Sequence, residues 1–389
     1  MTKDQVRSMP PFRSTRQGPA ARRGREFAWL LAAAAVVALR GPGARAELVG
    51  GIEIGAKGVK ATVVDLVADS DGYEVAVKLA DTTNTTLVAG LAQTEKFDPK
   101  AVEETAAAVG RYYKQMKADF GVKPERIYIV GSSGLFSPLQ DNPDQVRADQ
   151  KTLGEAVRGV TGASMTFIDS RREAELSVTG VVPRKYRAEA VLIDVGSGNT
   201  KGGYVGTGNQ FSSVGVPYGT VSFADLVARA GGSFPDQARK LREEKLAPAL
   251  KKELSTAAEM TTRRRVYLSG GIVWATATLT HPEDTRAFTP LGVGDIDDLH
   301  KRLAAEPGKF PETDLSAIAD EGKRQQARAE VEKVKKVYTP EQLLAGVQIL
   351  KALADEMQLG AGEKQVYFAR HGSLAWILAY VAEKGAGPK

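Results

Sequence analysis

The 389-residue chain contains no cysteine and only three histidines. Without cysteine there is no disulfide framework, no thiolate zinc site and no cysteine nucleophile. The histidines, His281, His300 and His371, are scattered along the chain, so no histidine metal site is predicted. No apolar run reaches the roughly 18 to 20 residues that a membrane-spanning helix needs. These absences indicate a globular protein whose stability depends on its core alone.

Outside its first 46 residues the chain has almost no net charge. Residues 1–46 hold nine Lys and Arg against two acids, whereas the remainder holds 44 against 45. The overall charge of +6 therefore belongs to the N-terminal segment. The remainder of the chain is nearly neutral and lacks the excess of basic residues with which proteins bind DNA or RNA, so no nucleic-acid partner is predicted.

The N-terminal segment has the three parts of a secretory signal peptide. Arg22, Arg23 and Arg25 precede an apolar run at 27–39, and the sequence Ala44-Arg45-Ala46 follows as a small-residue cleavage signal. Cleavage after residue 46 would start the mature chain just before the first predicted strand. We therefore expect an exported protein, periplasmic or extracellular, without a membrane anchor once the leader is removed. The general secretory and the twin-arginine routes both stay open, and an uncleaved anchoring segment is the alternative.

Hydrophobic periodicity and turn residues predict alternating strands and helices after the leader. Strands are predicted at 48–54, 59–66, 73–79, 126–130, 165–168, 190–195, 201–205, 211–216, 265–268 and 365–369. Helices are predicted at 101–120, 144–160, 172–181, 222–230, 237–250, 272–279, 340–359 and 374–383, with a charged, mostly helical stretch at 281–338. The last long helix is signalled by a capping box of Thr339 and Gln342 around Pro340.

A strand-turn-strand unit with a small polar turn occurs twice, near 48–66 and near 190–205. The repetition favours an α/β protein of two similar lobes that face one cleft, over a single doubly wound sheet. We expect an N-terminal lobe at 47–187 and a C-terminal lobe at 188–389 with a helical insertion at about 281–338. The helical region 281–359 is a candidate surface for a homodimer.

The first turn follows an acid at the end of a strand. Glu53 is followed by Gly55, Ala56 and Lys57 and then by Lys60. Glycine lets a backbone approach phosphate closely, and turn amides and lysines attract its oxygens. Gly55, Ala56 and Lys57 are therefore candidate phosphate-binding residues, and Glu53 is a candidate metal ligand. An ordinary hairpin turn is the alternative.

The second turn has the same pattern of an acid at a strand end followed by small residues, and a third Gly-rich turn lies further along the chain. Asp194 ends a strand and is a candidate ligand of Mg²⁺ or a group that orients water, because hard cations prefer carboxylate oxygen. Candidate phosphate-binding residues after it are Gly196, Ser197, Gly198, Asn199 and Thr200. Gly270 and Gly271 lie between a buried strand and a helix, where free amides suit a nucleotide edge.

Acidic and Gly-rich turns in both lobes, with the later Gly-Gly turn, resemble the phosphate and adenosine motifs of the actin/hexokinase/Hsp70 superfamily. The order of motifs is similar to that of the exopolyphosphatase/guanosine-pentaphosphate phosphohydrolase family over about 48–385. The segment 168–176 is similar to its Ile-Ser-Gly-x-Glu-Glu-Ala-x-Leu motif, 194–201 to its Asp-Ile-Gly-Gly-Gly-Ser-Thr-Glu motif, 214–219 to its Leu-Pro-Leu-Gly helix entry, and 129–136 to its Thr-Ser-Ala-x-Arg loop.

The resemblance implies two actin-like lobes and a site in the cleft between them. In the family a glutamate of the Glu-Glu-Ala motif activates the attacking water. Glu173 stands at the second glutamate of this motif and Arg172 replaces the first. Glu173 is the candidate base, together with Asp194, if the second glutamate is the catalytic one, and the base is lost if it is the first. The resemblance places Ser132 and Ser133 in a phosphate-binding loop.

Besides Arg172, the chain departs from the family pattern at four positions. Glu53 replaces an aspartate, Lys201 replaces a glutamate, and Phe136 and Leu374 stand where the family has arginines. These changes open two hypotheses: an exported, Mg²⁺-dependent hydrolase of polyphosphate or guanosine-pentaphosphate-type nucleotides, or a non-catalytic module that binds a phosphate ligand or nucleotide. A sugar kinase or a filament protein is disfavoured by the predicted export.

Overall fold

The computed structural model describes residues 47–69, 72–85, 87–89, 91–136, 139 and 141–385. The predicted signal peptide at 1–46 lies outside these residues. These described residues belong to one compact unit by their backbone contacts. Within the described ranges no helix is long and apolar enough to cross a membrane.

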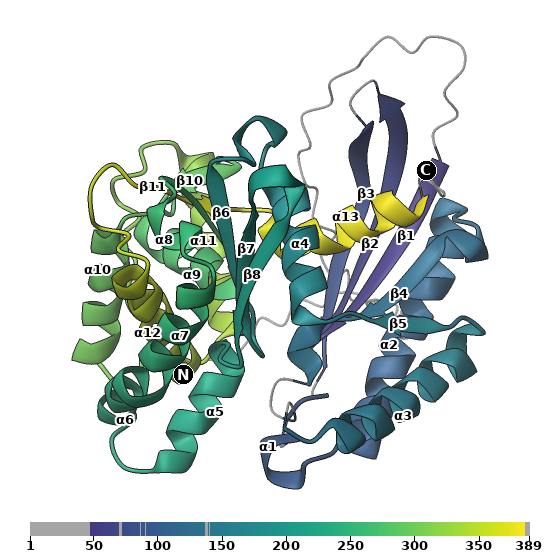
Figure 1. The fold of residues 1–389 in the computed structure, drawn as a ribbon, viewed down its shortest axis with the longest axis horizontal. Coiled ribbons are helices and arrows are strands. Elements are labelled where there is room, and N and C mark those ends of the chain that lie inside the picture. Colours follow the sequence, from purple (N-terminus) through teal and green to yellow (C-terminus); the bar gives the residue numbers. More distant parts are fainter. Residues whose placement is uncertain are drawn as a thin grey trace, which may run out of the picture. The chain divides into compact units, whose positions relative to one another are not determined.

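Two mixed β-sheets form two lobes (Figure 1). The first sheet has the order β3-β2-β1-β4-β5 and consists of β1 (Glu47–Gly55), β2 (Gly58–Asp69), β3 (Gly72–Asn84), β4 (Ile127–Gly131) and β5 (Met165–Phe167). The second has the order β10-β11-β9-β6-β7-β8 and consists of β6 (Ala190–Val195), β7 (Thr200–Val205), β8 (Phe211–Val216), β9 (Arg265–Ser269), β10 (Phe288–Pro290) and β11 (Gln365–Ala369).

The two sheets repeat one plan. In the first, β1, β2 and β3 form an antiparallel meander, and β4 and β5 continue the sheet in parallel from β1. In the second, β6, β7 and β8 form the meander, and β9 and β11 continue in parallel from β6. Only the antiparallel edge strand β10 has no counterpart among the described strands. The predicted two-lobed α/β fold is confirmed, and a single doubly wound sheet is excluded.

The helices cover these sheets. In the first half of the chain they are α1 (Leu91–Thr94), α2 (Pro99–Phe120), α3 (Pro143–Thr161) and α4 (Ser170–Val181). In the second half they are α5 (Thr220–Ala230), α6 (Phe234–Leu241), α7 (Ala247–Thr256), α8 (Glu259–Thr262), α9 (Gly271–Thr280), α10 (Val293–Ala305), α11 (Glu321–Val337), α12 (Pro340–Glu356) and α13 (Gly372–Gly385).

Local sequence explains where the long helices begin. At α2 the side chain of Asp98 accepts hydrogen bonds from the amides of Lys100 and Ala101, and Pro99 follows the cap. At α12 the predicted capping box is present, since Thr339 and Gln342 each accept from the other's backbone amide. These caps satisfy amides that a helix leaves without partners.

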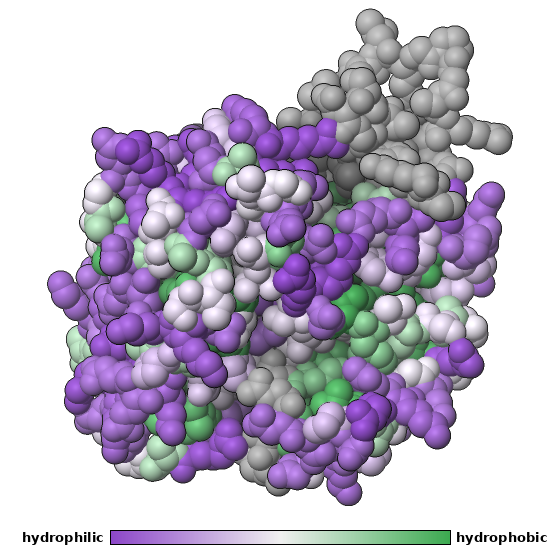
Figure 2. Space-filling model, in the orientation of Figure 1, coloured by the Kyte–Doolittle hydropathy of each residue, from purple (hydrophilic) through white to green (hydrophobic). Residues whose placement is uncertain are grey.

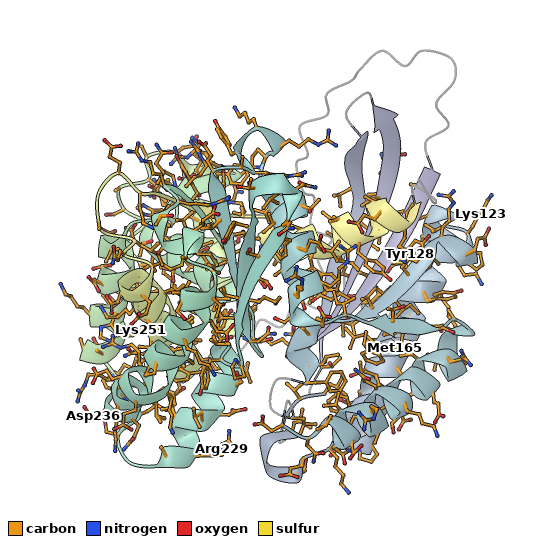
Figure 3. The ribbon with its side chains drawn as sticks, in the orientation of Figure 1. Lys123, Tyr128, Met165, Arg229, Asp236 and Lys251 are labelled. Carbon is orange, nitrogen blue, oxygen red and sulfur yellow. The ribbon has the colours of Figure 1, made fainter. Side chains whose placement is uncertain are left out.

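The last helix of each half of the chain contacts the sheet of the other half. Helix α4 packs on β6, β7 and β8, whereas α13 packs on β1 and β2 and against α4. Trp376 and Val381 of α13 lie in a buried cluster with Val49 of β1. Tyr128 of β4, labelled in Figure 3, meets Tyr380 of α13 edge-on at 6.2 Å between ring centroids. The exchanged helices bind the two sheets to each other (Figure 1).

Close packing of α4 on α13 depends on one glycine. A Cβ at Gly180 would lie 2.3 Å from the carbonyl oxygen of Ala375. No side chain fits in that space, so only glycine allows the two helices to approach this closely.

Two segments differ from the prediction. The helix expected at 237–250 is α6, a π-helical turn at Arg242–Leu246, and α7. Pro248 in the first turn of α7 has no N–H, so regular helical hydrogen bonding cannot continue through it. The stretch 281–338 also contains β10, whose three residues are too few for a periodic pattern.

Candidate functional site

Each meander begins with a hairpin that carries an acid opposite a lysine. In the first hairpin Glu53 of β1 is the register partner of Lys60 of β2. In the second, Asp194 of β6 is the register partner of Lys201 of β7. Side chains directly opposite each other on an antiparallel pair lie close enough to interact. The same acid–lysine pair thus occurs at the same place in both repeats.

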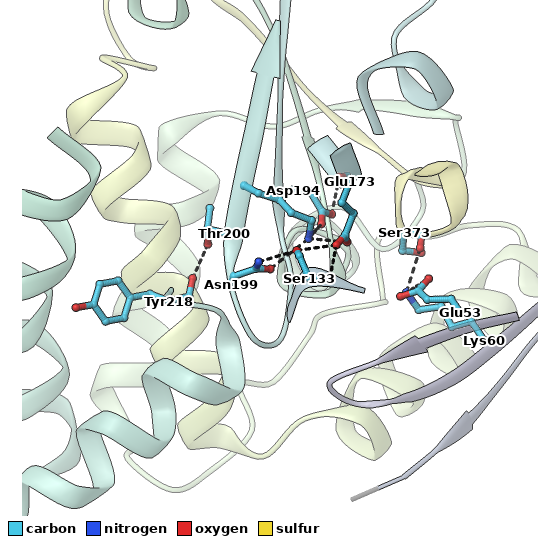
Figure 4. Close-up of polar contacts among 11 residues, drawn as sticks. Glu53, Lys60, Ser133, Glu173, Asp194, Asn199, Thr200, Tyr218 and Ser373 are labelled. Carbon is cyan, nitrogen blue, oxygen red and sulfur yellow. Dashed lines mark hydrogen bonds and ion pairs between the residues drawn. The ribbon is translucent and has the colours of Figure 1, made fainter. Parts of the chain in front are cut away.

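Lys201 lies among oxygens from three segments of the chain. Its Nζ is 2.9 Å from Oε1 of Glu173 and 2.9 Å from Oδ2 of Asp194. It also donates to Oδ1 of Asn199 at 3.3 Å. The Lys201 side chain is only 3% exposed, so water does not screen these charges. Figure 4 shows the arrangement around Asp194 and Glu173.

The charges in this arrangement shift each other's pKa. Burial alone would lower the pKa of Lys201, but the carboxylates of Glu173 and Asp194 outweigh it and raise that pKa. Burial likewise opposes ionisation of Asp194, but the charge and hydrogen bond of Lys201 hold its pKa below the usual value. Lys201 and Asp194 are therefore a charged pair at neutral pH.

Glu173 is fixed by a loop of the first lobe. It lies in the first turn of α4, whose N-cap is Asp169. Its Oε2 accepts from the backbone amide of Ser133 at 2.8 Å and from the Ser133 hydroxyl at 2.7 Å. The residue is only 3% exposed. The predicted catalytic carboxylate is therefore a buried group with a defined orientation and not a solvated residue on a helix face.

The Glu53–Lys60 pair lies close enough to Glu173 for the charge of that carboxylate to act on Glu53. Lys60 donates to both carboxylate oxygens of Glu53, at 3.1 and 3.2 Å, and to the carbonyl oxygen of Ser373 at the start of α13, at 3.1 Å (Figure 4). Burial raises the pKa of Glu53, Lys60 lowers it, and the negative charge of Glu173 raises it further, with a net rise. We call Glu53, Lys60, Glu173, Asp194 and Lys201 the charge cluster.

The predicted phosphate loops of the two lobes touch. Asn199 donates from Nδ2 to the Ser133 hydroxyl at 2.9 Å. A Cβ at Gly198 would lie 2.1 Å from the carbonyl oxygen of Gly134. Ser132 is buried behind this contact, and its amide donates to the carbonyl oxygen of Ile54 at 2.9 Å. The contact closes the site in this conformation.

The remaining residues of the second turn support its shape. The amide of Gly196 donates to the carbonyl oxygen of Asn199, and the carbonyl of Ser197 accepts from amides at the start of α5. Thr200 points away from the charge cluster and donates to the carbonyl oxygen of Tyr218 at 2.7 Å (Figure 4). This hydrogen bond ties the second turn to the segment that precedes α5.

The residues of the first turn lie at different distances from the charge cluster. Gly55 lies beside it, since a Cβ there would be 3.1 Å from Oε1 of Glu53, and Ala56 is buried. Lys57 instead crosses to the second lobe, where it donates to the carbonyl oxygen of Val337 at 3.2 Å and lies 3.7 Å from the ring centroid of Tyr338. Burial lowers the pKa of Lys57 to about 8.

The Gly-Gly turn packs against the second hairpin. Gly270 has φ +105°, and a Cβ there would lie 2.1 Å from the carbonyl oxygen of Val195. Gly271 lies against Tyr338, and a Cβ at Gly271 would be 2.2 Å from the Tyr338 hydroxyl oxygen. Neighbouring Ser269 donates its hydroxyl to Oδ1 of Asp194 at 2.8 Å. The turn therefore supports the charge cluster directly, through a serine that was not among the predicted site residues.

Two cavities border the contact between the loops. One of about 390 Å³ is lined by Gly134, Ser197 and Gly198 together with residues of α5. A larger one of about 610 Å³ is lined by Ser133 and Asn199 together with residues of α3, α4 and β8. No residue of the charge cluster lines either cavity. On the face in Figure 2 the surface is mainly hydrophilic, with an apolar area near the middle.

The donor set of the cluster does not fit Mg²⁺. That ion is bound in an octahedron of oxygens at about 2.0–2.1 Å, usually by one or two free carboxylates together with waters and phosphate oxygens. Here each predicted metal ligand is already neutralised by a lysine, Glu53 by Lys60 and Asp194 by Lys201. Among the described residues no group of three or more His, Cys, Asp or Glu side chains converges as a metal site would.

The comparisons with known proteins agree with the two-lobed fold. The structure of an Aquifex aeolicus member of the Ppx/GppA family is 18% identical, has a TM-score of 0.57 and matches 87% of this chain and 99% of that one. An exopolyphosphatase from Cytophaga hutchinsonii is 15% identical, with a TM-score of 0.59 over 85% and 98% of the two chains. An exopolyphosphatase-like protein is 15% identical, with a TM-score of 0.64 over 87% and 98%. No curated protein sequence matches.

The repeated sheets and these likenesses define an α/β protein of two actin-like lobes. The model of the Ppx/GppA phosphatase family matches residues 66–380, which is most of the chain. The protein belongs to this family. The match includes Glu173, Asp194 and Lys201 and begins after the Glu53–Lys60 hairpin.

Proposed function

We propose that the protein is a phosphohydrolase of the exopolyphosphatase type, which releases phosphate from polyphosphate or from guanosine-pentaphosphate-type nucleotides. One observation carries the proposal: Glu173 is a buried carboxylate held where the Ser133 loop of one lobe meets the Asp194 hairpin of the other. A carboxylate fixed beside phosphate-binding turns is suited to general-base catalysis.

The proposed reaction is attack of water on a terminal phosphorus. Glu173 takes a proton from the water molecule while the water oxygen bonds to phosphorus. The bridging P–O bond breaks at the same time, and its electron pair stays on the leaving phosphate. The amide and hydroxyl of Ser133 orient Glu173. Amides of the Gly-rich turns and the lysine ammonium groups offset negative charge, since phosphoryl transfer depends mainly on positioning and electrostatics. Substrate reaches Glu173 when the Ser133–Asn199 contact opens.

A non-catalytic module that binds phosphate ligands is the second candidate. It is favoured by the closed conformation, in which Oε1 of Glu173 faces Lys201 and Oε2 takes two hydrogen bonds from Ser133. Both oxygens of this carboxylate are thus already held by groups of the protein, and the residue is only 3% exposed. In this candidate the turns bind a phosphate compound and no turnover follows.

Phosphate release from long-chain polyphosphate by the purified full chain separates the two candidates. Glu173→Gln keeps the shape of the side chain but removes the base, so we expect release to fall by about 10²–10⁴-fold, the usual contribution of general-base catalysis. Glu175→Gln is the matched control, because Glu175 lies on the same helix, 44% exposed and paired with Arg172. No release by the parent chain, together with a rise in Tm on adding polyphosphate, would favour the binding module.

Export is part of the proposal. Nucleoside triphosphates are scarce outside the cytoplasm, whereas hydrolysis of a phosphoanhydride needs no ATP supply. The expected outcome is a secreted or periplasmic protein whose N-terminal residue is Glu47. N-terminal sequencing of protein recovered from the extracellular or periplasmic fraction checks this, and recovery of the intact chain from the cytoplasm alone would reject it.

A further inference from the structure

We propose that Lys201 takes the place of a divalent cation between Glu173 and Asp194, so that the site binds and processes its phosphate ligand without Mg²⁺. The inference rests on the proposed function for the identity of the ligand. Lys201 stands where the resemblance expects a glutamate, so its ammonium group supplies from within the chain the positive charge that a bound cation would supply.

The coordination of the ammonium group is the first support. An ammonium has three N–H donors and accepts no hydrogen bond. Lys201 has three oxygen partners, one each from Glu173, Asp194 and Asn199, at 2.9, 2.9 and 3.3 Å. Every donor of the buried side chain is therefore used, and the two carboxylates surround a fixed positive charge.

The other carboxylate oxygens are the second support. Oε2 of Glu173 accepts from the amide and hydroxyl of Ser133, and Oδ1 of Asp194 accepts from the hydroxyl of Ser269. A metal ion would have to displace Lys201 and draw both carboxylates inward, from hydrogen-bonding distance to about 2.0–2.1 Å. The displaced ammonium would then be buried beside a second cation, which is strongly unfavourable.

The repeated hairpin is the third support. Lys60 stands opposite Glu53 as Lys201 stands opposite Asp194, seven residues after the acid in both cases. The side chain of Lys60 is 29% exposed and that of Lys201 is 3% exposed. We assign Lys201 the permanent role of the internal cation, whereas Lys60 stays within reach of an entering phosphate.

Binding of Mg²⁺ without any phosphate compound tests the inference independently of the hydrolase proposal. Thermal unfolding of the full chain is followed while MgCl₂ is titrated, with NaCl at matched ionic strength as the control. We expect no Mg²⁺-specific rise in Tm for the parent chain. Lys201→Glu replaces the internal cation with a third carboxylate, so we expect its Tm to rise saturably with Mg²⁺.

A saturable rise in Tm of the parent chain that Asp194→Asn abolishes would overturn the inference. If Lys201→Glu does not fold, the titration of the parent chain decides alone. Release of phosphate from tripolyphosphate, assayed with Mg²⁺ and with EDTA, is the second readout. Release that persists in EDTA supports the inference, and release that EDTA abolishes and Mg²⁺ restores contradicts it. Absence of release under both conditions rejects the hydrolase, while the titration still decides the role of Lys201.

Discussion

Replacing Lys201 with methionine removes the positive charge from the charge cluster and keeps most of the side-chain volume. Glu173 and Asp194 would then face each other's charge, buried and without their shared partner. Removing one partner of a buried ion pair usually costs about 3–5 kcal/mol, because the remaining charge is left uncompensated. We expect Lys201→Met to destabilise the protein by this amount near neutral pH.

The hydrogen-bond geometry leads to a similar magnitude. Two of the three contacts of Lys201 are short, at 2.9 Å, and both are to carboxylates. Hydrogen bonds to charged groups contribute about 1.5–3 kcal/mol each, so two amount to about 3–6 kcal/mol. Uptake of a proton by one carboxylate in the variant would reduce this loss, which favours the lower half of the range.

The loss of stability caused by Lys201→Met should also depend on pH. In the parent chain the pKa of Asp194 is lowered, so its stabilising effect is present above the unfolded value of 3.8 and is lost as the pH falls through the folded pKa. Without Lys201, burial would raise that pKa above the unfolded value. The variant would then lose stability as the pH rises through the raised pKa, so its deficit should be larger at pH 8 than at pH 5.

Urea unfolding followed by circular dichroism at both pH values measures this deficit. Lys151→Met is the matched control, because Lys151 and its partner Glu155 are 77% and 69% exposed. We expect the control to change stability by less than about 0.5 kcal/mol. A deficit for Lys201→Met below about 1 kcal/mol, or one equal at both pH values, would refute the buried charge pairing.

Two further predictions concern the other hairpin and the loop contact. The raised pKa of Glu53 makes the folded state lose stability as the pH rises from 4.5 through that pKa, so Glu53→Gln should gain stability relative to the parent as the pH rises. Tm measured at pH 4.5 and pH 7.5 checks this, and a relative loss at the higher pH would contradict it. Gly198→Ala should cost about 1–3 kcal/mol by forcing Gly134 away. Gly159→Ala, in α3 with no atom within 4 Å of the new Cβ, should stabilise by about 0.5–1 kcal/mol. Urea unfolding compares the two glycine variants, and equal stability of Gly198→Ala and the parent would contradict the loop contact.

Most elements could be predicted because their signals are local. Strand β6 and strand β11 have the predicted bounds, since each is a short apolar run between turn residues. Helix α12 begins as predicted after its N-cap Thr339, because the capping box is encoded within four residues. Strand β10 has no such signal and exists because it pairs with β11 at a sheet edge.

The candidate site was predictable only in part. Asp194 and the turn after it are recognisable because an acid at a strand end before glycines is a pattern of adjacent residues. The spacing of seven that repeats in Glu53–Lys60 and Asp194–Lys201 is visible in the sequence, but it indicates a pair only once β1 and β6 are known to form hairpins. The contact of Lys57 with Val337 joins residues 280 apart and has no local signal.

The sequence by itself determined the strands, the helices and the two Gly-rich turns, because caps, periodicity and turn residues act over a few neighbouring positions. Only the tertiary structure decided which charges meet. Glu173 reaches Lys201 because α4 packs on the second sheet. Ser133 reaches Glu173 because the short helical turn Ser133–Leu135, which follows β4, contacts α4. The electrostatic state of a buried carboxylate depends on groups within a few ångströms of it, and packing brings those groups from distant parts of the chain.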